Sequence, residues 1–264
     1  MTNQRTIFNL LIAAVFLIAA NRAYGEWDPQ FLISQSMIEG TRWNDLNHQK
    51  FRTLKVEVIK ALENKWCTKE KAELIMDLIL LERCQNCVEI GVFDGGSFLP
   101  IAATLNYLHQ GKAYAIDPWS NWQATRYMAE TDPNKEWWGT VDMDWVYKAY
   151  KRMLKEWKLE SYCVTFKETS ESAVGKVRDI DFLHFDGNYS KATSLFDARE
   201  YLPQVKIGGY ILFSNLFLSV NGDQPKMDAF FYLLDSCEIV CEIDSGSTVL
   251  LKKISETTTA DEDE

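Results

Sequence analysis

A glycine-rich turn follows a short apolar segment near residue 90. Residues 87–91 read Cys-Val-Glu-Ile-Gly, and Asp94-Gly-Gly-Ser97 follows just before a predicted helix. Glycines permit a tight turn and a close backbone approach to a ligand, and a helix N-terminus presents free N–H groups. The spacing differs from the dinucleotide pattern G-x-G-x-x-G because Glu89 occupies the place of the first glycine. A carboxylate there suits a cationic amino-acid group better than a pyrophosphate.

An acidic residue ends the next apolar segment. Asp117 follows Ala113-Tyr-Ala-Ile116 and lies 21 residues after Gly96. An acid at the end of a second strand is placed to accept hydrogen bonds from ribose hydroxyls. The alternative is that the glycines and Asp117 only form loops, because both residue types are common in turns.

Predicted strands and helices alternate along most of the chain. The predicted helices are residues 51–65, 69–83, 97–109, 142–159, 190–202 and 225–234. The predicted strands are residues 87–91, 113–117, 162–166, 180–185, 209–213, 237–243 and 248–252. This alternation indicates an α/β fold with a mostly parallel sheet covered by helices on both faces. The last two strands have no helix between them, so we expect an antiparallel edge strand.

The motifs together resemble those of class I S-adenosylmethionine-dependent methyltransferases. Residues 88–97 resemble the first motif of that family, residues 115–119 the second, and residues 181–190 and 207–215 later ones. The group that includes sugar and small-molecule O-methyltransferases is the most similar, and catechol-type enzymes are more distant. The resemblance runs from about residue 68 to residue 253. It implies a Rossmann-like, doubly wound, seven-stranded sheet, S-adenosylmethionine as cofactor, and O-methylation of a small molecule or sugar.

The resemblance also assigns cofactor-binding residues. The first turn would line the methionine and ribose portions, Asp117 would hold the ribose, and the residues after the third strand would lie near the adenine. The residues expected to bind the cofactor are Glu89, Gly91, Gly95, Gly96, Ser97, Asp117 and Ser170, with Thr169 as an alternative to the last.

The metal and base positions depart from the pattern of metal-dependent relatives. Asp186 matches the first metal ligand, but Ser214 replaces the second acid and Asn215 follows it. The resemblance therefore implies a weak Mg²⁺ site at Asp186 and Asn215. Asp186 and Tyr189 are the expected catalytic residues, although a tyrosine with a pKa near about 10 is a poor base at neutral pH. We expect His184 to be a core residue.

Tryptophans are concentrated in and after a long connection, residues 118–141. These are Trp119, Trp122, Trp137, Trp138, Trp145 and Trp157. Ordered connections longer than about 12–15 residues are commonly functional, so this one could form a lid or an acceptor pocket with stacking faces. We expect Trp145 and Trp157 to pack a helix against the sheet instead. For Trp137 and Trp138 both interpretations stay open.

The amino-terminal segment resembles a secretory signal. Residues 7–20 are nearly all apolar, Arg5 precedes them, and Ala23-Tyr-Gly25 offers small residues for cleavage. A 14-residue helix reaches about 21 Å against a hydrocarbon core of about 30 Å, which favours export over an uncleaved membrane anchor. The expected organisation is a signal or anchor at 1–25, a helical segment at 26–67, the methyltransferase domain at 68–254 and a disordered acidic tail at 255–264.

Charge and cysteine content narrow the partners. The net charge is −10, five of the negative charges lie in residues 256–264, and no basic patch is evident, so nucleic acid is excluded as a partner. We expect a small-molecule acceptor, and membrane contact only through an uncleaved N-terminus. The six cysteines permit disulfides in an exported protein, but Cys84 and Cys87 are expected to be buried apolar residues.

Two classes of function remain from the sequence. The first is a methyltransferase. The second is an exported binding protein that keeps the fold and has lost catalysis, which Ser214, Tyr189 and the export signal motivate, since the methyl donor is made in the cytoplasm. A dinucleotide-dependent oxidoreductase is weaker because of Glu89.

Overall fold

A computed structural model describes residue 45 and residues 48–256 of the chain. The predicted targeting segment, residues 1–25, lies outside the described residues, as do residues 257–264 of the predicted acidic tail. Among the described residues, no helix combines the length and apolar character needed to cross a membrane.

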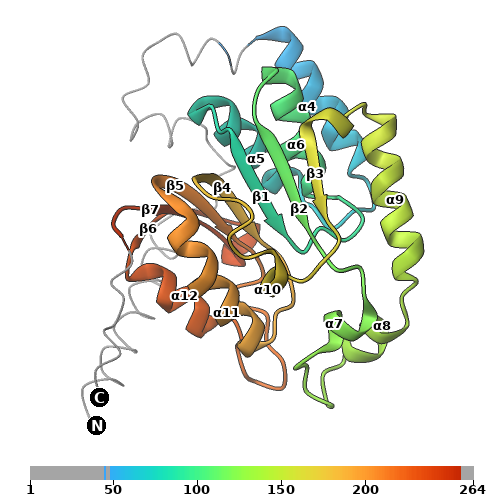
Figure 1. Cartoon of the computed structure of the whole chain (residues 1–264), viewed down its shortest axis with the longest axis vertical. Coiled ribbons are helices and arrows are strands. Elements are labelled where there is room, and N and C mark those ends of the chain that lie inside the picture. The colour runs from blue at the N-terminus through green and yellow to red at the C-terminus, as the bar shows by residue number, and fades with distance from the viewer. Residues whose placement is uncertain (1–44, 46–47, 257–264) are drawn as a thin grey trace.

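One seven-stranded sheet forms the centre of the structure, in the order β3-β2-β1-β4-β5-β7-β6 (Figure 1). The strands are β1 Asn86–Ile90, β2 Lys112–Ile116, β3 Cys163–Phe166, β4 Ile180–Phe185, β5 Val205–Phe213, β6 Cys237–Ile243 and β7 Thr248–Lys253. The first five strands pair in parallel, and β7 pairs antiparallel with both β5 and β6. The predicted fold class is confirmed, with the antiparallel strand β7 one place inside the edge because the closing hairpin inserts its second strand next to β5.

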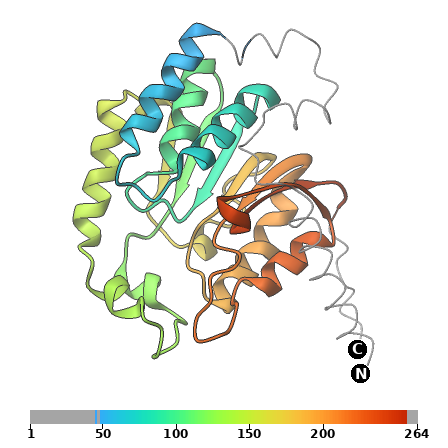
Figure 2. The same ribbon diagram turned by 180° about the vertical axis from the view of Figure 1, so that it is seen from behind.

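Helices cover both faces of this sheet (Figures 1 and 2). The long helices are α4 Gln49–Ala61, α5 Lys69–Glu82, α6 Phe98–Leu108, α9 Met143–Glu156, α11 Lys191–Tyr201 and α12 Met227–Leu234. The shorter α7, α8 and α10 span Asn121–Thr125, Lys135–Thr140 and Ser170–Ala173. Successive strand residues point to opposite faces, so Cys87 packs with α4, α5, α6 and α9 while Val88 packs with α10, α11 and α12.

Helix α5 begins at a side-chain cap that the sequence indicates. The Thr68 hydroxyl accepts a hydrogen bond from the Lys71 backbone N–H at 3.0 Å. The same hydroxyl donates to the Asp244 carboxylate at 2.6 Å, in the turn between β6 and β7. The cap therefore fixes the first turn of α5 and joins it to the carboxyl-terminal hairpin.

The long connection after β2 is ordered and carries α7 and α8, which project from one end of the sheet (Figure 1). Two asparagines hold it. The Asn121 amide donates to the carbonyls of Trp138 and Val141, both at 2.8 Å. The Asn188 amide, in the loop after β4, donates to three carbonyls of the connection at 3.0–3.1 Å. Five carbonyls of the connection are thus satisfied by these two side chains, in addition to the backbone hydrogen bonds of its own turns and helices.

The cysteines of the described chain form no disulfide. Cys84 and Cys87 are buried, as expected from the apolar run they precede, and Cys163 is half-buried. Burial raises the pKa of Cys67 and of Cys163 to about 12, so these thiols stay protonated at neutral pH.

Candidate functional site

A cavity of about 350 Å³ opens where the parallel strands end, in the volume range of small-molecule sites. It lies at the carboxyl ends of β1, β2 and β4, which is where ligands bind in open α/β sheets. Of the residues predicted for the site, those that line the cavity are Gly91, Gly96, Ser97, Asp117, Ser170, Asp186, Tyr189 and Asn215. Glu89 and Gly95 do not line it.

The Asp117 carboxylate joins the glycine-rich turn to the end of β2. Its Oδ2 accepts hydrogen bonds from the backbone N–H groups of Val92 and Phe93, both at 2.9 Å, and its Oδ1 accepts from Trp119 N–H at 2.7 Å. The Trp119 indole closes the loop by donating to the Phe93 carbonyl at 2.7 Å. A carboxylate accepts about four hydrogen bonds, so one position on Asp117 stays open towards a ligand.

Gly91 allows the ends of β1 and β4 to approach each other. Its φ is +84°, and a Cβ built on it would lie 2.4 Å from the Asp186 carbonyl oxygen and 2.5 Å from the Gly187 Cα. Gly95 also has a positive φ, and a Cβ there would meet the Met153 side chain at 2.4 Å. The close approaches that these two glycines permit are therefore to other parts of the chain, and the cavity forms as a result.

Substitution of Gly91 by Ala should be strongly destabilising. The new methyl group would overlap backbone atoms that cannot move aside, in addition to the cost of a positive φ, so we expect a loss of several kcal/mol in the free energy of unfolding. Gly175→Ala is the matched control: its φ is +78° and nothing lies within 4 Å of the added Cβ, so only the backbone cost of about 1 kcal/mol applies. Equal losses in urea denaturation of the two variants would contradict this account of the turn.

Glu89 and His184 form a buried pair beneath the cavity floor. The Ser97 hydroxyl donates to Glu89 Oε1, and His184 Nδ1 lies 3.1 Å from the same oxygen. His184 Nε2 lies 2.9 Å from the Ser214 hydroxyl. The side chains of Glu89 and His184 are both fully buried, which confirms the core position expected of His184. Burial raises the pKa of Glu89, an effect that its contact with His184 opposes, and its second oxygen, Oε2, has no hydrogen-bond partner.

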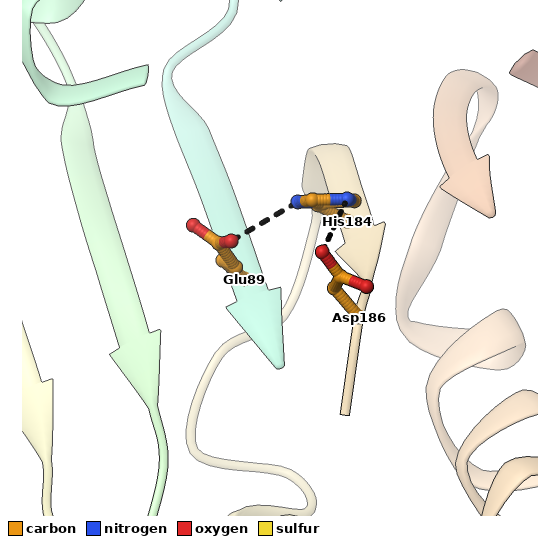
Figure 3. Close-up of side chains that lie close together, drawn as sticks. All are labelled: Glu89, His184 and Asp186. Atoms are coloured by element: carbon orange, nitrogen blue, oxygen red, sulfur yellow. Dashed lines mark hydrogen bonds and ion pairs between the residues drawn. The ribbon is translucent and has the colours of Figure 1, made fainter. Parts of the chain in front are cut away.

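Glu89, His184 and Asp186 are close enough together to resemble a metal site. Figure 3 shows His184 between the two carboxylates: Glu89 contacts one ring nitrogen of His184, and Asp186 lies 3.7 Å from the other. In this arrangement each carboxylate faces a different ring nitrogen of His184. Glu89 and His184 are hydrogen-bonded to each other, whereas Asp186 lies beyond hydrogen-bond distance of the ring.

Lys71 is a residue of the site that the sequence analysis missed. It lines the cavity from the first turn of α5, its side chain is 8% exposed, and its Nζ donates to the Ser214 hydroxyl at 3.0 Å. The same nitrogen lies 3.9 Å from Asp186 Oδ2. A signal for it exists in the sequence, because Lys71 stands on the apolar stripe of a predicted helix, four residues before Ile75 and seven before Leu78.

Tyr189 lines the cavity but is not placed as a base. Its hydroxyl donates to the Asp132 carboxylate at 3.0 Å, in the connection that carries α7 and α8. Burial raises the pKa of Tyr189 to about 12, further from neutrality than a free tyrosine. In this structure Tyr189 ties the loop after β4 to the long connection, and its catalytic role stays a prediction.

Asp197 is a second site residue that the sequence analysis missed. It lies on α11, lines the cavity near Ser170, is 3% exposed, and its Oδ1 has no hydrogen-bond partner. Burial raises the pKa of this carboxyl to about 7. An unpaired carboxylate oxygen at a cavity wall is suited to accept a hydrogen bond from a ligand.

Asp197 should make stability depend on pH. Because its pKa is about 7 in the folded chain and 3.8 ordinarily, the folded state holds a proton between about pH 4 and pH 7 that the unfolded state has released. Its contribution to the free energy of unfolding therefore falls as pH rises through that window, by at most roughly 4 kcal/mol at 1.36 kcal/mol per pKa unit. Above pH 7 the contribution no longer changes. In urea titrations, Asp197→Asn should gain on the wild type as pH rises from 4 to 7. Parallel stability curves for the two proteins would refute the assignment.

Four aromatic rings form a wall at the mouth of the cavity, here called the aromatic wall: Trp66, Phe93, Trp137 and Trp138. Trp66 stacks on Phe93 with ring centroids 4.9 Å apart and lies 5.1 Å from Trp137. Trp138 meets Phe93 edge-on at 5.7 Å. Trp66 is 60% exposed although it lines the cavity and stacks on Phe93.

Trp145 and Trp157 were both expected to pack a helix against the sheet, and only one of them does so. Trp157 packs against the core, as predicted, but Trp145 is 59% exposed and the prediction for it is wrong. The buried stripe of α9 is Met143, Val146, Tyr150 and Met153, and position 145 falls on the opposite side of the helix.

Comparison with known proteins agrees with this geometry. Residues 88–216 match the family model of the methyltransferase domain. No curated protein matches the sequence.

Solved structures share the fold at low sequence identity. The O-methyltransferase NovP superposes with a TM-score of 0.56 at 13% identity, over 71% of this chain and 81% of that one. The O-methyltransferase TomG from Streptomyces achromogenes, involved in tomaymycin synthesis and solved with S-adenosylmethionine, gives 0.52 at 12% identity, over 84% and 99%. The Podospora anserina methyltransferase PaMTH1, solved with S-adenosylhomocysteine, gives 0.53 at 11% identity, over 76% and 88%. The resemblance to class I methyltransferases that the motifs indicated is thereby confirmed.

Proposed function

We propose, from the premise that the chain carries a class I S-adenosylmethionine-dependent methyltransferase domain, that it methylates an oxygen atom of a small molecule with an aromatic or sugar ring. The observation that carries the proposal is the pair of hydrogen bonds that the Asp117 carboxylate accepts from Val92 and Phe93. These bonds bring the glycine-rich turn and the end of β2 together at one wall of the cavity. The alternative of a binding protein without catalysis is not favoured by the O-methyltransferases that share the fold.

The polar groups around the cavity fit the parts of this cofactor. The open acceptor position of Asp117 suits a ribose hydroxyl, and Ser170 with the unpaired oxygen of Asp197 suits a donor group of the adenine. The buried, unpartnered Oε2 of Glu89 supplies negative potential under Ser97, where a cationic amino group would be favoured.

The chain's own contribution to the reaction is positioning. The cofactor, when bound, supplies a methyl group on a positively charged sulfur, which is already activated for transfer. Asp186, Asn215 and Lys71 lie at the wall where β4 and β5 end and offer polar contacts to an acceptor hydroxyl. Alignment of acceptor and donor in a cavity closed by aromatic rings is a sufficient source of rate for such a transfer.

The acceptor class follows from the aromatic wall. Trp66, Phe93 and Trp138 line the cavity, and their faces and edges bind flat rings by stacking. The small-molecule acceptor expected from the sequence therefore narrows to one with an aromatic or sugar ring.

We also propose export through residues 1–25, on the basis of the apolar segment and the small residues that follow it.

Cofactor binding tests the premise directly. Isothermal titration of the full chain with S-adenosylhomocysteine should show one site. Asp117→Ala should weaken binding at least about tenfold, because it removes the ribose acceptor and releases the turn after β1. The absence of binding by the wild type at millimolar ligand would overturn the proposed function.

Asp181→Ala is the matched control for that titration. The Asp181 carboxylate also accepts two backbone N–H groups, from Gln85 at 2.8 Å and Asn86 at 2.9 Å, but at the start of β1, away from the cavity. It should lose comparable stability and keep the affinity of the wild type. Equal loss of affinity in both variants would mean that Asp117 acts only through stability.

A further inference from the structure

We propose that the ammonium group of Lys71 takes the place of the divalent cation at the acceptor end of this site, so that the site works without a metal ion. The inference rests on the proposed function and concerns the wall of the cavity formed by Asp186, Ser214 and Asn215. It is drawn from the position of Lys71 and from the chemistry of the groups around it.

Lys71 is held in place by groups from three distant parts of the chain. Its Nζ donates to the Ser214 hydroxyl at 3.0 Å and lies 3.9 Å from Asp186 Oδ2 and 4.0 Å from Asp244 Oδ2. Its backbone N–H donates to the Thr68 cap, whose hydroxyl in turn donates to Asp244. The positive charge is therefore fixed between two carboxylates, at the end of β5, with little freedom to leave.

The donor set around Asp186 does not fit a magnesium ion. Mg²⁺ requires near-octahedral oxygen ligands and is usually held through carboxylates. Here Asp186 offers one carboxylate, its Oδ1 already accepts the Asn215 amide N–H at 2.8 Å, and the Ser214 hydroxyl is shared by Lys71 and His184. The expected weak Mg²⁺ site at Asp186 and Asn215 is therefore better described as a site whose ligands are already bonded to each other.

The charges at this wall also oppose a second cation. Lys226, 2% exposed on the loop before α12, donates to the Ser214 carbonyl, so two lysine side chains reach the same residue from two sides. A divalent ion beside Asp186 would lie within a few ångströms of the Lys71 ammonium, where like charges repel strongly in a partly buried setting.

An ammonium group can stabilise the acceptor oxygen in the way that a divalent metal ion does. It places a positive charge beside the oxygen and donates a hydrogen bond to it, which stabilises a partly or fully negative oxygen. Lys71 lines the cavity, so an acceptor oxygen can reach it. The acceptor oxygen then forms the new bond to the methyl carbon while the carbon–sulfur bond breaks with its electron pair on sulfur. The hydroxyl proton passes to Asp186 Oδ2 or to water in the cavity, and Lys71 keeps its protons throughout.

Titration with Mn²⁺, followed by electron paramagnetic resonance, tests the proposal without an acceptor. The full wild-type chain should show no specific site at millimolar Mn²⁺. The double variant Lys71→Ala, Ser214→Asp removes the built-in charge and restores the second acid, so it should bind one Mn²⁺ at least tenfold more tightly than the wild type. Lys65→Ala, Ser214→Asp is the matched control, because Lys65 pairs with Asp94 at the cavity rim and its removal leaves Lys71 in place; its Mn²⁺ affinity should stay near that of the wild type.

Two results would overturn the proposal. One is a stoichiometric Mn²⁺ site in the wild type that Asp186→Asn removes. The other is a folded double variant, as judged by circular dichroism, that binds no Mn²⁺. If the double variant does not fold, the wild-type titration decides alone. Titration of the wild type with S-adenosylhomocysteine reports separately on the proposed function, so the failure of one inference can be told from the failure of the other.

Discussion

The hydrogen bonds of one carboxylate organise this site. Asp117 ends β2 and receives the backbone N–H groups that leave β1, so two neighbouring strands finish in a common, rigid edge. Without those bonds the N–H groups of Val92 and Phe93 would face a buried region unpaired. The indole of Trp119 then fastens the start of the long connection to the same turn. The cavity lies beside that edge and is also lined by residues of the aromatic wall and of the loop after β4.

Three of the non-glycine residues with a positive φ lie at strand ends near the cavity. Phe93, Trp119 and Asn215 all have φ between +45° and +60°, a region that side chains other than glycine and asparagine rarely occupy. Each lies in a turn that leaves a strand and enters the site. The surrounding hydrogen bonds compensate for the cost of these conformations, which is typical of positions where a fold serves a ligand.

Much of the fold follows from the sequence because it depends on local patterns. The alternation of apolar strands and amphipathic helices predicts the order of elements, and β4 spans the predicted residues 180–185. The start of β5 was missed because its register shifts opposite residues 180–182, a feature of pairing rather than of sequence. The outward position of Trp145 could have been found by helical spacing, since it lies off the stripe of Met143, Val146 and Tyr150.

The site was less accessible to sequence analysis because its bonds join distant residues. The glycine-rich turn and Asp117 are adjacent to strand ends and were found. The partner of Tyr189 is Asp132, 57 residues away, and that of Lys71 is Ser214, 143 residues away. No spacing rule connects such pairs. For the pair of Lys71 and Ser214, the only local signal in the sequence is a lysine on the apolar face of a helix. What that lysine binds depends on the residues that the fold places beside its ammonium group.

The cap of α5 gives the architecture a further consequence. The hydrogen bond between Thr68 and Asp244 ties a helix that precedes the first strand to a turn near the carboxyl end. The matched domain, residues 88–216, includes neither of them, nor Lys71, nor Lys226. A comparison limited to residues 88–216 therefore leaves out the two lysines that reach Ser214. If Lys71 acts as proposed, a substitution outside residues 88–216 would be enough to change the ion requirement of this site.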